Sequence, residues 1–99
     1  MVYNEVIAVA KGNRDLIKTL KIFANEHRLA ILGVLKNKGE RSVGQIADSL
    51  EISFNTVSKN LLYLAKKGIL GKRYDGPFVL YKISNPISEP ARFIISRLL

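Results

Sequence analysis

Between residues 39 and 70 the chain carries two signals for the start of a helix, eleven residues apart. Ser42 and Gln45 fit a capping box, in which the Ser42 hydroxyl accepts the amide of Gln45 and the Gln45 side chain reaches back. The second signal is Ser53, which follows a break in the apolar pattern and predicts a helix that begins at Phe54. Two short helices joined by a tight turn are typical of a helix-turn-helix.

The second of these helices is predicted to bury one face and expose the other. Val57, Leu61 and Leu64 recur at i, i+4 and i+7, which is the spacing of one buried stripe. Its outward residues are short hydrogen-bonding side chains beside one lysine: Asn55, Thr56, Ser58, Lys59 and Asn60. Such side chains at the front of a recognition helix read base edges in the major groove, and lysine contacts phosphate. A solvated helix face has the same composition, so this pattern alone does not choose between the two.

A two-stranded ribbon is predicted directly after this helix. Residues 69–74 and 78–83 are rich in apolar and aromatic side chains, and Asp75-Gly76 between them is a strong signal for a tight turn. Lys72 and Arg73 place two cations on the ribbon. The expected fold is therefore mainly α with a small β-hairpin, in the arrangement of a winged helix-turn-helix.

Apolar stripes also mark the two ends of the chain. Asn13 and Ser88 are expected to cap a helix near each end. The stripes are wide for a small protein, which favours an interface between two subunits, with completion of the core of one subunit as the alternative. The residues concerned are Leu16, Leu20, Phe23, Ile94, Ile95 and Leu98. Residues 1–10 fit either an extra helix or a strand.

Composition favours a polyanionic partner. The 99 residues include 16 Lys and Arg against 8 Asp and Glu, which gives a formal net charge of +8. This charge attracts nucleic acid phosphates and would equally suit an anionic membrane surface, so charge alone does not choose. Because no apolar stretch approaches the ~20 residues that span a bilayer and no export signal is visible, we expect a cytoplasmic protein without a membrane partner.

The order and spacing of these residues resemble the ArsR family of winged-helix repressors. The most specific part is residues 53–61, Ser-Phe-Asn-Thr-Val-Ser-Lys-Asn-Leu, which is similar to the family pattern serine-x-x-threonine-valine-serine-basic-histidine-leucine. Asn60 departs from the usual histidine. Arg28 matches an arginine of the family, and the expected contact is either a phosphate or a carboxylate. The resemblance implies a small prokaryotic DNA-binding homodimer, and many members of the family are released from DNA by metal ions.

Metal sensing is not expected for this chain. Metal-sensing members carry a Cys-x-Cys where this sequence has Ser42 and Gly44, and the chain contains no cysteine. The single histidine, His27, lies beside Glu26 at a predicted helix start. Soft or borderline metal ions need three or four convergent ligands from Cys, His and carboxylate side chains. We therefore expect neither a metal site nor a cofactor.

The sequence predicts a homodimeric, DNA-binding transcription repressor, built as one winged-helix domain over residues 1–99 with dimerisation helices at both ends. The residues expected to contact double-stranded DNA are Ser42, Ser53, Asn55, Thr56, Ser58, Lys59, Asn60, Lys72 and Arg73. An enzyme is not expected, because neither a Gly-rich phosphate loop nor a nucleophile with a histidine base is present. The alternatives are a winged helix that binds another protein and, third, RNA binding through exposed aromatic side chains.

Overall fold

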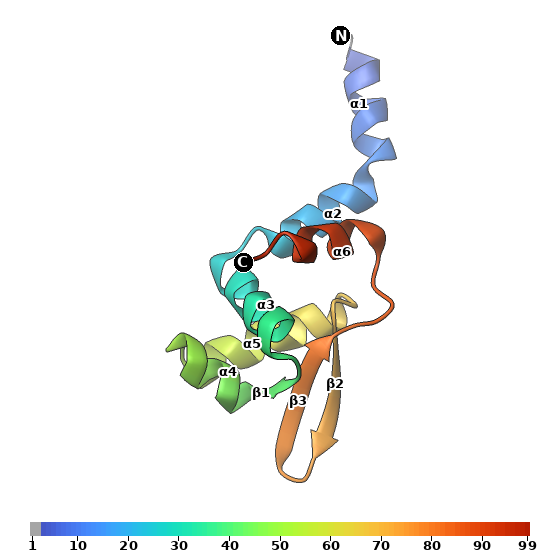
Figure 1. Cartoon of the computed structure of the whole chain (residues 1–99). Helices are drawn as coiled ribbons and strands as arrows, with labels where there is room; N and C mark the ends of the chain where they lie inside the picture. Colours follow the sequence, from blue (N-terminus) through green and yellow to red (C-terminus); the bar gives the residue numbers. More distant parts are fainter. Residues whose placement is uncertain (1–2) are drawn as a thin grey trace.

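The computed structural model describes residues 3–99, which form six helices and three strands (Figure 1). The molecule is elongated, with overall extents of 56 × 26 × 22 Å. In chain order the elements are α1 (Tyr3–Gly12), α2 (Arg14–Phe23), α3 (Glu26–Lys38), β1 (Arg41–Ser42), α4 (Val43–Leu50), α5 (Phe54–Lys66), β2 (Leu70–Asp75), β3 (Phe78–Ile83) and α6 (Glu89–Ser96). Helices α3, α4 and α5 pack above the hairpin, α2 and α6 lie side by side, and α1 projects from the body (Figure 1).

Serine side chains determine where α4 and α5 begin. The Ser42 Oγ accepts the amide of Gln45 at 3.2 Å and the Gln45 Oε1 accepts the amide of Ser42 at 2.9 Å, so the predicted capping box is confirmed. At the start of α5 the Ser53 Oγ accepts the amide of Thr56 at 3.2 Å. Between the helices Glu51 has a φ of +54°, in the left-handed region, which turns the chain sharply. The predicted helix-turn-helix is confirmed.

The core lies where α3, α4 and α5 meet the base of the sheet. Six large side chains there are fully shielded from solvent: Ile31, Leu32, Ile46, Val57, Leu61 and Leu64. The last three are the stripe that the sequence predicts for α5. Because full burial of such a side chain contributes about 1.5–3 kcal/mol relative to exposure, this stripe fixes the orientation of α5 on the body.

The wing is a hairpin to which β1 adds a short third strand, in the order β1-β3-β2. Asp75 pairs with Phe78, so the loop consists of Gly76 and Pro77 rather than the predicted Asp75-Gly76. Gly76 has a φ of +58° at the first loop position, as a type II′ turn requires, and the fixed φ of a proline ring suits the second position. The tip of the wing is therefore placed one residue later than the sequence signal indicates.

The two terminal helix starts differ from the prediction. Asn13 and Ser88 occupy the N-cap positions of α2 and α6, but neither side chain makes a capping hydrogen bond. The Asn13 Nδ2 instead donates to the carbonyl of Val9 at 2.9 Å, so this amide serves the end of α1. The sequence left open whether residues 1–10 form a helix or a strand. The structure shows a helix, α1, over residues 3–12. Residues 1 and 2 lie outside the described residues.

We predict that Ser42→Ala lowers the free energy of unfolding by about 1 kcal/mol, because it removes the capping bond at the start of α4. The matched control is Ser88→Ala, which also replaces a serine at an N-cap position but loses no capping bond, and we expect a change within about 0.5 kcal/mol. Urea unfolding at one fixed protein concentration measures both. Equal destabilisation by the two substitutions would contradict the assignment.

Candidate nucleic-acid interface

The exposed face of α5 carries a row of residues at helical spacing. Asn55, Lys59 and Leu62 are exposed at i, i+4 and i+7, and the half-buried Ser58 lies beside this row. Asn55, Ser58 and Lys59 therefore lie on the side of α5 that faces away from the core, as the sequence analysis expects. These three side chains offer an amide, a hydroxyl and an ammonium group to a ligand outside the body.

Several other residues that were predicted to contact DNA form hydrogen bonds within the subunit. The Ser53 hydroxyl donates to the Thr56 Oγ1 at 2.9 Å, and the Asn60 Nδ2 donates to the Thr56 carbonyl at 2.9 Å. Thr56 and Asn60 are half-buried, whereas Ser53 is exposed. Ser42 is only 8% exposed and its hydroxyl accepts a hydrogen bond from the Gln45 amide, so little of this side chain is open to a ligand.

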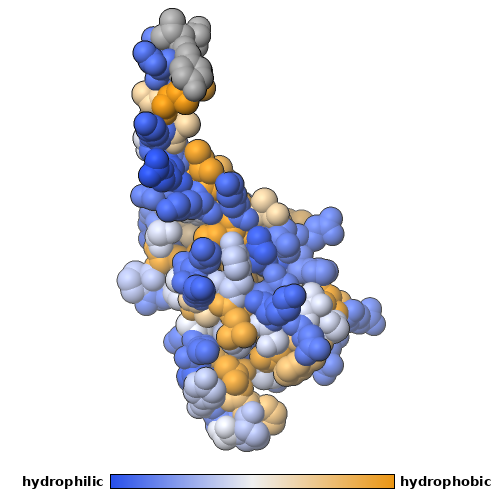
Figure 2. Space-filling view, turned by 180° about the vertical axis from the view of Figure 1, so that it is seen from behind, coloured by the Kyte–Doolittle hydropathy of each residue, from blue (hydrophilic) through white to orange (hydrophobic). Residues whose placement is uncertain are grey.

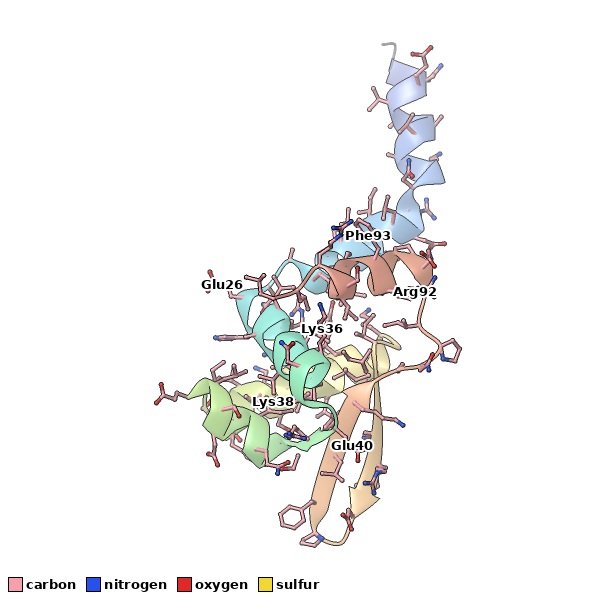
Figure 3. All side chains as sticks on the ribbon, viewed as in Figure 1. Glu26, Lys36, Lys38, Glu40, Arg92 and Phe93 are labelled. Carbon is pink, nitrogen blue, oxygen red and sulfur yellow. The ribbon has the colours of Figure 1, made fainter. Side chains whose placement is uncertain are left out.

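The two cations of the wing lie on opposite faces of β2, as neighbours in a strand do. The Arg73 guanidinium binds the carboxylate of Glu40 through three contacts of 2.7 to 3.1 Å (Figure 3 labels Glu40 beside the hairpin). The Lys72 ammonium lies 5.9 Å from the ring centre of the exposed Tyr74. Lys72 therefore points to the face of the wing away from Glu40, and the charge of Arg73 is offset locally by a carboxylate.

The Glu40 and Arg73 pair shifts the titration of both groups. The hydrogen bonds from the Arg73 guanidinium, followed by its charge, hold the pKa of Glu40 below its ordinary value. The same contact raises the pKa of Arg73. Solvent screens a pair this exposed, so its main effect is to connect the segment before β1 with β2.

Arg28 makes contacts within the subunit that the sequence analysis does not anticipate. Its Nε donates to the carbonyl of Ile22 at 2.6 Å and its Nη2 donates to the carbonyl of Lys21 at 3.2 Å. Its guanidinium carbon lies 4.4 Å from the ring centre of Tyr63. These carbonyls belong to the last turn of α2, where they have no helical partner, so Arg28 of α3 ties α2 to the Tyr63 ring of α5.

An apolar groove lies between α2 and α6. Leu16 and Leu20 of α2 line it together with Pro90, Phe93 and Ile94 of α6 (Figure 3 labels Phe93). Leu20 is 51% exposed, and both Leu16 and Phe93 are exposed as well. Figure 2 shows that apolar residues continue from the body onto the projecting end of the molecule.

Only part of the expected subunit interface lies in this groove. Phe23 and Ile95 are 5% and 7% exposed and belong to the core of one subunit, which is the alternative that the sequence left open. Ile94 and Leu98 are half-buried against the same core. Of the six residues predicted for the interface, Leu16 and Leu20 present the most surface to a partner.

The sequence analysis did not identify two residues near α5 and the wing as functional candidates. Phe54 is exposed at the first position of α5, and its signal is an apolar side chain placed before the first residue of the buried stripe. Glu40 gave no signal, because its partner Arg73 lies 33 positions later in the chain.

Residues 3–99 contain no group of three or more His, Cys, Asp and Glu side chains that could hold a metal ion. His27 is exposed in the first turn of α3. None of the described helices is both long and apolar enough to cross a membrane.

This geometry defines a winged helix-turn-helix, a class of protein that presents one helix and a ribbon to DNA. Residues 23–70 match the family model described as a helix-turn-helix domain. The transcriptional activator HlyU of Vibrio cholerae is 35% identical over 75 residues, which cover 76% of this chain and 68% of HlyU. The arsenical resistance operon repressor of Escherichia coli is 35% identical over 79 residues, which cover 80% of this chain and 68% of the repressor. The chain belongs to the ArsR family of winged-helix transcriptional regulators, and it is a DNA-binding regulator of transcription.

Solved structures agree with this assignment. Reduced HlyU from Vibrio cholerae has a TM-score of 0.76 at 31% identity, with 90% of each chain covered. A homodimeric winged helix-turn-helix domain from Mycobacterium bovis, described as a possible ArsR-family regulator, has a TM-score of 0.67 at 30% identity and covers 85% of this chain and 78% of its own. The fold predicted from the sequence is confirmed.

We predict that the pKa of Glu40, measured by NMR titration of its side chain, lies below that of an ordinary exposed glutamate. Arg73→Ala should raise it toward the ordinary value, whereas Arg92→Ala, which removes the partner of Glu89 instead, should leave it unchanged. Because the pKa is lowered by folding, the pair stabilises the fold above the ordinary glutamate pKa and is lost as the pH falls through the lowered pKa. A Glu40 pKa that does not respond to Arg73→Ala would show that the pair is absent in solution.

Proposed function

We propose that this protein is a homodimeric repressor that places α5 in the major groove of a pseudo-palindromic operator. The observation that carries the proposal is the outward row of Asn55 and Lys59 with Ser58 beside it, held in place by the buried stripe on the opposite face of α5. Asparagine and serine read base edges, and lysine binds phosphate. Lys72 and Arg73 are proposed to anchor the wing to the backbone, and Ser53, Thr56 and Asn60 to shape the start of the helix at the DNA surface.

We further propose that residues 1–99 form one winged-helix domain and that α2 and α6 form the dimer interface. The groove lined by Leu16, Leu20 and Phe93 leaves apolar surface uncovered in one subunit. A related structure from Mycobacterium bovis is described as homodimeric, which supports the same assembly here. The protein is proposed to act in the cytoplasm and to have no catalytic activity, because the relatives are transcription regulators.

The first test of the proposal is selection from random DNA. We predict a preferred pseudo-palindrome whose half-sites lie about one helical turn, roughly 34 Å, apart. Affinity for the selected duplex and for random duplexes is measured at several salt concentrations, and both should weaken as salt rises. If selected and random duplexes bind alike at every salt concentration, this chain does not recognise an operator, and the protein-binding alternative takes its place.

Substitutions separate reading from anchoring in the same assay. Asn55→Ala should relax the preference for one base, at about 1–3 kcal/mol for a good bidentate contact. Lys72→Ala should weaken all duplexes alike and flatten the dependence on salt. Arg73→Ala should behave like Lys72→Ala but with a smaller effect, because Glu40 already offsets its charge. A wing substitution that changes base preference would reverse these roles.

We predict that Leu20→Asp abolishes the dimer, because it places a charge in an apolar interface at a cost of several kcal/mol. Leu20 is exposed in one subunit, so the subunit should still fold. Phe78→Asp at the exposed tip of the wing is the matched control and should remain dimeric. Equilibrium sedimentation at micromolar concentration distinguishes them, and a wild-type monomer or a dimeric Leu20→Asp would disprove this interface.

Regulation is proposed to be independent of metal ions and of thiol oxidation, since the chain has no cysteine and a single histidine. Zinc, cadmium, nickel, copper and arsenite at stoichiometric amounts should leave DNA affinity unchanged in a non-chelating buffer. His27→Ala serves as the control, because two copies of His27 in a dimer are the histidines that a shared site would need. A metal that releases DNA from the wild type but not from His27→Ala would overturn this prediction.

A further inference from the structure

We propose that Phe54 is a specificity residue that reads thymine, by contact of its ring with the C5-methyl group at the major-groove edge. This inference rests on the proposed function, because it requires α5 to lie in the major groove. It assigns to an apolar side chain a part of the recognition that the polar row of α5 does not perform.

The position of Phe54 places its ring at the front of the recognition helix. Phe54 is the first residue of α5, directly after the Ser53 cap, and the N-terminal residues of such a helix are those that contact base edges. The buried stripe begins only at Val57, and Phe54 is 57% exposed. The core therefore does not hold this ring, and its apolar surface is in water when DNA is absent.

The surroundings of Phe54 make it a reader of a methyl group. Phe54 lines an apolar hollow with Val43 and Gly44 of α4 and with Phe78 and Val79 of the wing, so it lies on the wing side of α5. Thymine alone of the four bases presents a methyl group in the major groove, and an apolar side chain is what recognises it. Contact with that methyl group would remove apolar surface of both partners from water, which is favourable.

The polar row beside Phe54 cannot distinguish thymine from uracil, because the two bases offer the same hydrogen-bonding edge. The thymine O4 atom accepts hydrogen bonds as guanine O6 does, and Asn55 and Ser58 can donate to either acceptor. The methyl group is the feature that distinguishes thymine from uracil with the same hydrogen-bonding edge. A contact to the methyl group therefore has a chemical signature separate from every hydrogen bond of the interface.

The experiment replaces thymine with uracil in the selected duplex, one symmetric pair of positions at a time. At one pair of positions we expect the affinity of the wild type to fall about 15-fold, which corresponds to about fourfold for each buried methyl group. Phe54→Ala should bind the original duplex with a similarly reduced affinity and should not respond to uracil at that pair. Leu62→Ala, which also removes an exposed apolar side chain from α5 but two turns later, is the matched control and should respond as the wild type does.

Each outcome decides the inference. If no exchange of thymine for uracil alters the affinity of the wild type, or if Phe54→Ala responds as strongly as the wild type, Phe54 does not read thymine and the proposed function stands. If selection yields no preferred duplex, the proposed function itself fails and this inference falls with it. Circular dichroism of Phe54→Ala confirms its fold, and a wild type that responds to uracil at no position would overturn the inference even if that variant is unstable.

Discussion

The burial of one face of α5 is the constraint on which the rest of this structure depends. Val57, Leu61 and Leu64 are fully buried, so α5 cannot rotate about its axis without exposing them to water. The same helix has to leave its opposite face free, and the row of Asn55 and Lys59 lies there. The packing of the buried face thus sets the direction in which the outward side chains point, because both sets of side chains belong to the same rigid helix.

Polar contacts set the limits of the elements that this core positions. The Ser42 and Ser53 caps determine where α4 and α5 begin, and hence which residues occupy the first turn of α5. Arg28 binds the last carbonyls of α2 and stacks on Tyr63, which connects α2 to α5 across α3. The carboxylate of Glu40 connects the start of the sheet to the wing. None of these contacts needs to contribute much free energy, because each only favours one of the arrangements that the packed core already permits.

Local signals made much of this fold predictable from the sequence. The capping box at Ser42, the Ser53 cap and the stripe from Val57 depend on residues within a few positions of one another, and the structure confirms them. The acceptors of the arginine side chains were not predictable, whether the partner is far along the chain, as Glu40 is for Arg73, or near, as the end of α2 is for Arg28. A basic residue has many acceptors within reach, and only the folded chain decides which of them it meets.

The apolar side chains of the terminal helices also have partners that the sequence does not predict. Spacing predicts which residues of α2 and α6 share a face, but not whether that face meets its own subunit or a second one. The structure divides the set: Phe23 and Ile95 fill the core, and Leu16 and Leu20 stay in the open groove. Because Arg28 and Phe23 tie α2 to the body that carries α5, a partner bound at this groove would fix the separation and the angle of two recognition helices. Under the proposed assembly, the spacing of the operator half-sites is therefore set by the packing of α2 rather than by any residue that touches DNA.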